Sequence, residues 1–201
     1  AEYLCGQFDE AERRFEELLG RARDALDKAQ VHVLRLVQYE NLSRFAEAAR
    51  IGREGLRLFG VSFPEDEEGK RAALEAEVRA IDALRGQRPI ESLAGLPVMT
   101  DPQTRMVLRL LTDIWSVAYI SGDSALAFLA SARNVALSIE HGHTEDSAYG
   151  YVTHAISVGP LRGEYEAAYE WGRLALAVNE RFADQKRRAK IHQQFNAHVT
   201  L

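Results

Sequence analysis

The sequence lacks most of the features that thiol chemistry, secretion or membrane insertion require. Its 201 residues contain a single cysteine, Cys5, which excludes an internal disulfide and a thiol-rich metal site. No apolar run approaches the roughly 18 residues of a membrane-spanning helix, and no signal peptide is apparent. We therefore expect a cytoplasmic protein that does not insert into a membrane. Its first and last residues also suggest a segment cut from a longer chain.

The charges are not gathered as they are in proteins that bind nucleic acids. The chain has 25 Lys and Arg against 30 Asp and Glu, a net charge of −5, and both signs are interspersed. A duplex-binding protein depends on clustered Lys and Arg. One basic run, "KRRAK" (186–190), is interpreted as the solvated face of a final helix. The sequence thus predicts a folded protein with no nucleic-acid partner.

Signals for β-strands are missing, and helical periodicity dominates. In "FDEAERRFEELL", for example, Phe8, Ala11 and Phe15 recur on one face. "TDPQ" is typical of a helix start, with Asp101 as cap and Pro102 in the first position. The chain is therefore predicted to be all-α. Helices are expected over residues 8–19, 24–42, 46–58, 67–86, 102–120, 124–141, 145–160, 165–182 and 185–201.

One stretch interrupts this pattern. "QRPIESLAGLPVMTDP" carries three of the five prolines and has no clear periodicity. It divides the chain into helical hairpins over 1–86, an irregular connection over 87–101 and further hairpins over 102–201. We expect the two parts to form one continuous array.

Four segments of the chain resemble one another. In each segment a tight turn leads into a helix with a small residue near its start. This small residue follows an aromatic residue by three positions, except in the third segment, where it follows Ser124 by three positions. The segments are "CGQFDEAERRFEELL", "NLSRFAEAARIGREGLRL", "ISGDSALAFLASARNVAL" and "LRGEYEAAYEWGRLALAV". The aromatics are Phe8, Phe45 and Tyr165, and the small residues are Ala11, Ala48, Ala127 and Ala168. We expect the alanine to permit close helix approach and the aromatic to plug the gap at the turn.

The second and fourth segments also share a glycine inside the helix. Gly52 and Gly172 each follow a large apolar residue and precede an arginine. Glycine in a helix interior costs roughly 0.5–1 kcal/mol relative to alanine. Its recurrence therefore indicates close helix–helix contact at both places.

This pattern resembles the tetratricopeptide repeat, in which helical hairpins stack into a right-handed α–α superhelix. The match is degenerate, because His32 replaces the large aromatic that usually opens the first helix.

A second resemblance rests on "YLCGQFDEAERRFEELLGRARDALDKAQVHVLRLVQYENLSRFAEAARIGREGLRLFGVSFPED", "LPVMTDPQTRMVLRLL", "EHGHTEDSAYGY" and "YEWGRLALAVNERFAD". These stretches look like the helical-repeat region of very large bacterial signalling proteins. Such chains carry kinase-like, AAA-type ATPase, GAF and histidine-kinase domains. The resemblance implies a docking or regulatory region without catalysis of its own.

A stacked array is expected to bind its partner in a groove lined by the first helix of each hairpin. The partner would be a protein, either a peptide segment or a neighbouring domain of the same chain. A homodimer through exposed terminal repeats is a further expectation. The candidate groove residues are Gln30, Val33, Val37, Glu40, Asn41, Arg109, Thr112, Ser116, Tyr119, Thr153 and Ser157.

Motifs for catalysis or cofactors are missing or weak. There is no phosphate-binding loop and no protein-kinase signature. "EHGHTED" (140–146) has metal-ligand residue types, but the end of one helix and the capped start of the next account for it better. "PEDEE" (64–68) is likewise interpreted as a helix start. No cofactor or metal is expected.

Three functions stay open at this point. The first is a non-catalytic scaffold that mediates protein–protein or interdomain contacts within a bacterial signal-transduction kinase or ATPase. The second is a ligand-sensing helical domain with an enclosed pocket beside residues 87–101. The third is a metal-dependent hydrolase centred on "EHGHTED".

Overall fold

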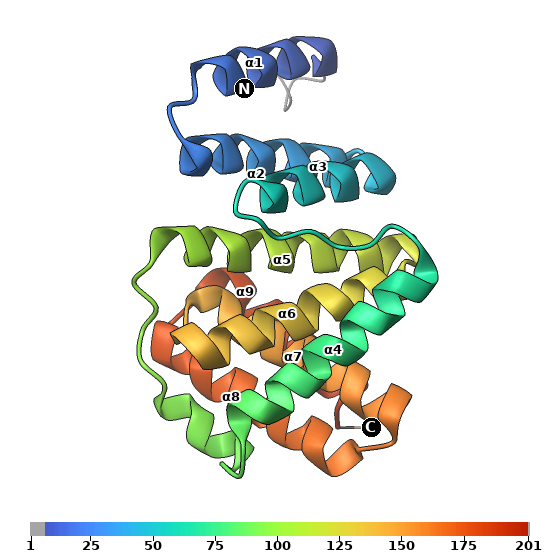
Figure 1. The fold of residues 1–201 in the computed structure, drawn as a ribbon, viewed down its shortest axis with the longest axis vertical. Coiled ribbons are helices and arrows are strands. Elements are labelled where there is room, and N and C mark those ends of the chain that lie inside the picture. The colour runs from blue at the N-terminus through green and yellow to red at the C-terminus, as the bar shows by residue number, and fades with distance from the viewer. Residues whose placement is uncertain (1–6, 201) are drawn as a thin grey trace.

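A computed structural model describes residues 7–200, so that Cys5 lies outside the described residues. Within this range the chain is helical throughout, and its only β-type pairing is an isolated bridge between Val98 and His143 (Figure 1). The predicted all-α class is confirmed, and each helix begins and ends close to its expected position. The elements are α1 (Phe8–Arg21), α2 (Ala25–Asn41), α3 (Phe45–Arg57), α4 (Glu67–Arg85), the 3₁₀-helix η2 (Ile90–Gly95), α5 (Pro102–Ser121), α6 (Ser124–His141), α7 (Glu145–Arg162), α8 (Tyr165–Phe182) and α9 (Gln185–His198).

Side-chain caps explain where several helices begin. Asp101 accepts a hydrogen bond from the backbone N–H of Thr104 at 2.7 Å, and Pro102 occupies the first turn, as "TDPQ" predicts. Asp66 of "PEDEE" caps α4 in the same way, through the N–H of Gly69 at 2.7 Å. The acidic run is thus a helix start, as expected.

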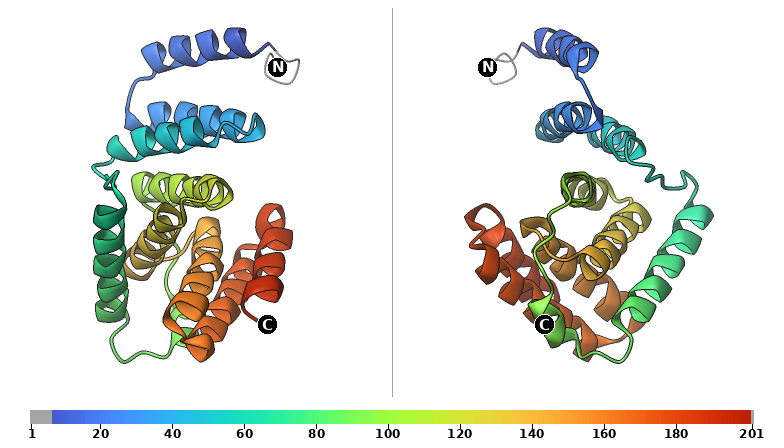
Figure 2. Two further views of the ribbon diagram at one scale, coloured as in Figure 1. Left: turned by 90° about the vertical axis from the view of Figure 1, so that its right-hand side faces the viewer. Right: turned by 60° about the vertical axis from the view of Figure 1, so that its left-hand side comes forward.

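Successive helices pack against one another along the chain. In Figures 1 and 2, α1, α2, α3 and α5 lie one below another, and the later helices continue from α5. Apart from α4, each helix from α2 onward contacts the next, and α2, α5, α7 and α9 contact one another in that order. Three of these helices, α2, α5 and α7, are first members of the predicted hairpins, and the contacts place α9 in the same layer.

Helix α4 departs from this order. It packs against α6 and runs along the outside of the molecule, across the direction of α5 (Figure 2). The buried Lys70 ammonium joins it to Asp123 at 2.8 Å, and Glu77 accepts from Arg133 at 3.2 Å. The repeat pattern in the sequence assigned no place to this helix.

The irregular connection over 87–101 is fastened to the helices beside it. The N–H of Met99 donates to the carbonyl of His143 at 2.9 Å, and the N–H of His143 donates to that of Pro97 at 2.8 Å. Arg181 of α8 donates to the carbonyl of Leu96 at 2.6 Å. Ile90 and Leu93 are buried, and η2 packs on α8. Ile90, Leu93 and Met99 of this connection therefore pack into the core, whereas Val98 is exposed.

The two repeated glycines lie at helix contacts, as predicted. A Cβ atom at Gly52 in α3 would lie 2.5 Å from Cγ1 of Ile114 in α5. A Cβ atom at Gly172 in α8 would lie 2.5 Å from Cδ2 of Phe195 in α9. In both cases the glycine meets the first helix of the following hairpin, so the two positions are equivalent in three dimensions. Ala11, Ala48, Ala127 and Ala168 are also buried, which confirms the expected close packing at the small residues.

The role predicted for the aromatic residues at the turns is wrong for Tyr165. Its side chain is 67% exposed, and Phe8 is 39% exposed, whereas Phe45 is partly buried. The turn before Tyr165 is closed by the backbone, because Gly163 adopts φ +70° and donates to the carbonyl of Gly159 at 2.8 Å. The exposed Tyr165 ring does not fill a gap at this turn; its Cδ1 lies 3.5 Å from the position that a Cβ atom at Gly159 would occupy.

The core is centred on α5, α6 and α7. Helix α7 is buried from Asp146 to Gly159, because α5, α6, α8 and α9 all pack against it. Over the range 7–200, none of the helices is both long and apolar enough to cross a membrane.

Candidate functional site

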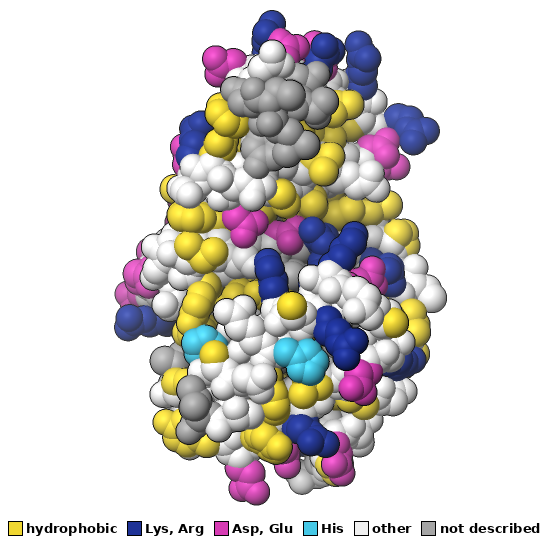
Figure 3. Space-filling model, turned by 180° about the vertical axis from the view of Figure 1, so that it is seen from behind, with side chains coloured by type: hydrophobic (Ala, Val, Ile, Leu, Met, Phe, Trp, Pro, Cys, Tyr) yellow, Lys and Arg dark blue, Asp and Glu magenta, His cyan; other side chains and the backbone are white. Residues whose placement is uncertain are grey.

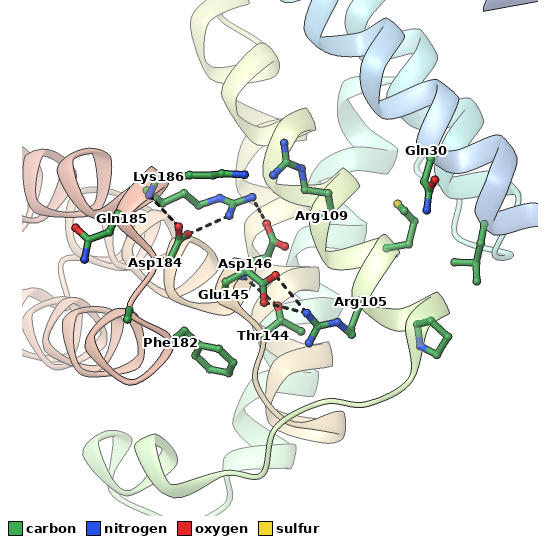
Figure 4. A pocket seen from close by; sticks show the side chains of 15 residues that line it. Gln30, Arg105, Arg109, Thr144, Glu145, Asp146, Phe182, Asp184, Gln185 and Lys186 are labelled. Atoms are coloured by element: carbon green, nitrogen blue, oxygen red, sulfur yellow. Dashed lines mark hydrogen bonds and ion pairs between the residues drawn. The ribbon is translucent and has the colours of Figure 1, made fainter. Parts of the chain in front are cut away.

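An open groove crosses the layer formed by α2, α5, α7 and α9 (Figure 4). Its volume is about 780 Å³, within the range of about 300–1,000 Å³ typical of ligand sites. Its walls lie near the N-terminal ends of these four helices. The lining residues are Leu26, Gln30, Pro102, Arg105, Met106, Arg109, Thr144, Glu145, Asp146 and 182–187. We call this cavity the groove.

A smaller cavity of about 170 Å³ lies beside the groove. It shares Arg109, Lys186 and Arg187 with the groove, so the two cavities adjoin. Its remaining lining comes from α5, α7 and α9. Those residues are Thr112, Asp113, Ser116, Tyr149 and Lys190. We call this cavity the inner pocket.

Local sequence explains how α7 and α9 enter the site. Thr144 caps α7, because its Oγ1 accepts from the N–H of Asp146 at 3.1 Å, and the N–H of Thr144 in turn donates to Oγ of Ser147 at 3.0 Å. Asp184 caps α9 through the N–H of Lys186 at 2.9 Å. The turn between α8 and α9 thus brings the basic run of α9 to the edge of the groove.

Arginine–carboxylate pairs hold the floor of the site together. Arg187 of α9 contacts Asp146 of α7 at 2.5 Å and Asp184 at 3.1 Å, and all three side chains are at most 10% exposed. At the outer edge, Arg105 of α5 pairs with Glu145 of α7 at 3.1 Å. Ion pairs therefore tie α5 and α9 to the start of α7.

A further pair, between Arg109 and Asp113 at 2.9 Å, lies within α5. Burial raises the pKa of Asp146 to about 6, against the attraction of Arg187 and Arg109. Burial also raises the pKa of Asp113, although Arg109 lowers it. Arg187 thus contacts two carboxyl groups, those of Asp146 and Asp184.

Some of the predicted groove residues line the two cavities. Gln30 and Arg109 line the groove, and Arg109, Thr112 and Ser116 line the inner pocket. The structure thus brings together residues that come from two hairpins. Five other predicted residues contribute to neither cavity, namely Val33, Val37, Glu40, Asn41 and Tyr119.

Two predicted groove residues, Thr153 and Ser157, are instead buried at 1% and 6% exposure. Their hydroxyls donate to carbonyls of the preceding turn of α7, at 2.8 Å in both cases. The hairpin pattern indicated an open face on α7, but α5, α6, α8 and α9 all pack against this helix, and Oγ1 of Thr153 lies 3.0 Å from Oγ of Ser131 in α6. These two residues therefore serve packing and not binding.

The basic side chains of α9 were not predicted to belong to a site. "KRRAK" was interpreted as a solvated face, yet Arg187 is buried and both Lys186 and Lys190 line the inner pocket. A signal was present in the sequence. Lys186 and Lys190 are four residues apart and therefore share a helix face, as do Arg105 and Arg109 on α5. What the sequence did not show is that these two faces oppose each other.

The side chains of "EHGHTED" that could bind a metal contact other protein groups instead. His143 is fully buried, with its Nε2 2.8 Å from the hydroxyl of Tyr151, and burial lowers its pKa to about 4. Glu145 and Asp146 pair with arginines, and Thr144 is the cap that was predicted. Across residues 7–200 no three His, Cys, Asp or Glu side chains are placed to hold a metal ion.

Comparisons of the chain with protein families, with curated proteins and with solved structures find no match.

Proposed function

We propose that the chain is a non-catalytic helical-repeat scaffold that binds a segment of another protein, or of a neighbouring domain, in the groove. The groove carries this proposal, because most of its lining comes from α2, α5, α7 and α9, the first helices of the proposed hairpins, and Phe182 at the end of α8 completes it. An array of stacked hairpins presents such a surface to its partner.

Two further observations support a tetratricopeptide-like superhelix. Contacts between helices are mainly sequential, as in an array in which each hairpin packs on its neighbours. Gly52 and Gly172 both meet the first helix of the following hairpin, so the packing repeats as well as the sequence. Helix α4, which packs outside this order, is an insertion in the array.

The resemblance to large bacterial signalling proteins suggests the setting. There, this segment would connect sensor and output domains in the cytoplasm and relay their state through protein contacts. The groove would then receive part of the same chain or of a second signalling protein.

Selection from a library of random twelve-residue peptides displayed on phage tests groove binding without a known partner. We expect peptides that bind the wild-type protein and lose binding in Gln30→Trp, because the added indole fills part of the groove. Gln193→Trp is the matched control, since Gln193 is an exposed glutamine of α9 that does not line the groove. If the selected peptides bind both variants equally, or if none is selected, the groove is not a docking site.

A further inference from the structure

The charged groups of the two cavities are unequally exposed to an incoming ligand. Lys186 and Lys190 are exposed, and within residues 7–200 neither has a carboxylate partner. The neighbouring carboxylates lie deeper: the side chains of Asp146, Asp184 and Asp113 are only 7%, 9% and 13% exposed, and each contacts an arginine. A ligand therefore meets ammonium groups first, while the negative charges are already paired.

These cations come from opposite sides of the site. Lys186 and Lys190 are one turn apart on α9, and Arg109 reaches the same inner pocket from α5. In Figure 4 the side chain of Lys186 extends toward the side of the groove where Arg109 lies. Figure 3 shows Lys and Arg side chains gathered across the middle of the face on which α9 lies. The arrangement favours an anionic group between α5 and α9.

The outer part of the groove is apolar by contrast. Leu26, Met106 and Phe182 line it and come from α2, α5 and α8. Apolar side chains that enter a groove contribute about 25 cal/mol per Å² of area removed from water. The site thus combines a place for apolar side chains with a place for an anion next to it.

We propose that the groove binds an acidic peptide segment, with leucine-like side chains against Leu26, Met106 and Phe182 and a carboxylate in the inner pocket facing Lys186 and Lys190. This inference rests on the proposed function and specifies the chemistry of its partner. A carboxylate suits the site better than a nucleic-acid backbone. The cations that line the two cavities exceed the carboxylates by only one, and the chain as a whole carries −5.

The test is fluorescence anisotropy with three labelled dodecapeptides. The first contains leucine with glutamate and aspartate, the second replaces the acids by glutamine and asparagine, and the third replaces them by lysine. We expect the acidic peptide to bind at least tenfold more tightly than the amide peptide at low salt, with the difference shrinking as salt is added, because exposed charges are screened.

Charge reversal on α9 gives the decisive comparison. In Lys186→Glu/Lys190→Glu the acidic peptide should bind at least tenfold more weakly, and the lysine peptide should bind more tightly than it does to the wild type. The matched control is Lys28→Glu/Arg188→Glu, which changes the net charge equally at two exposed positions outside both cavities. The control should stay within threefold of the wild type.

The outcomes separate this inference from the proposed function. If the amide peptide binds as tightly as the acidic one and Gln30→Trp abolishes both, the groove binds peptides but the acidic preference is refuted. An unchanged affinity of the acidic peptide in Lys186→Glu/Lys190→Glu also overturns it. Tighter binding of a single-stranded twelve-nucleotide oligomer than of the acidic peptide would mean that the lysines serve nucleic acid instead.

Discussion

Replacing Gly52 by alanine tests whether close helix contact explains the repeated glycine. The new Cβ would lie 2.5 Å from Cγ1 of Ile114 and 2.9 Å from Cδ1 of Leu36, whereas carbon atoms in contact prefer about 3.5–4.0 Å. Ile114 and Leu36 are both completely buried, so neither can turn toward solvent. The helices must therefore separate, or a side chain must leave its preferred rotamer.

Two opposing effects set the magnitude. Overpacking a well-packed core typically costs about 1–3 kcal/mol, and contact with two fully buried side chains puts this site near the upper end. Alanine also improves helix propensity by about 1 kcal/mol. We therefore expect Gly52→Ala to lower the free energy of unfolding by about 2 kcal/mol. For a chain of this size that corresponds to a fall in Tm of about 4–8 °C.

Gly20→Ala is the control for the propensity effect. Gly20 lies in α1, and no atom lies within 4 Å of the position that its Cβ would occupy. This variant should be as stable as the wild type or more stable by up to about 1 kcal/mol. Urea denaturation followed by circular dichroism measures both variants.

A double-mutant cycle with Ile114→Ala makes the reasoning sharper. Ile114→Ala removes the atoms that the new Cβ meets at 2.5 and 2.9 Å on α5. In that background Gly52→Ala should cost less, because only the 2.9 Å contact with Cδ1 of Leu36 remains, so the coupling should be about 1 kcal/mol or more. If Gly52→Ala alone is as stable as the wild type, close helix contact is not the reason for the glycine.

Three other predictions follow from the packing and the buried charges. Gly172→Ala should also lower stability, by about 1–2 kcal/mol, because the new Cβ would lie 2.5 Å from Cδ2 of the buried Phe195; a variant as stable as the wild type in thermal unfolding would contradict this. Arg187→Met should lower stability to urea by about 3–5 kcal/mol, because its two aspartate partners lose their counter-charge, and adding Asp146→Asn should restore part of the loss. Burial lowers the pKa of His154 to about 3 in the folded state. When the pH falls below about 6.5, the imidazole of the unfolded chain therefore takes up a proton, whereas that of the folded chain does not. Stability should therefore fall between pH 7 and pH 5, and His154→Leu should reduce that fall by about 2 kcal/mol in urea titrations at the two pH values.

Local chemistry was sufficient to predict the secondary structure. Apolar periodicity and caps such as Asp66, Asp101 and Thr144 act within a few residues, and the helices begin and end near the predicted positions. The close contacts at Gly52 and Gly172 could also be inferred. A glycine that weakens its own helix in two related segments needs a compensating contact.

The site depended on tertiary structure, because its residues come from segments far apart in the chain. Arg109 and Lys190 each lie on an ordinary helical face, and only the packing of α5, α7 and α9 makes them line one pocket. The burial of Thr153 and Ser157 has the same origin, since α5, α6, α8 and α9 all pack around α7, whereas the hairpin pattern leaves one of its faces open. The sequence by itself determined which residues form helices and where those helices must approach closely. Only the tertiary structure decided which helix faces meet, because that depends on contacts between residues tens of positions apart.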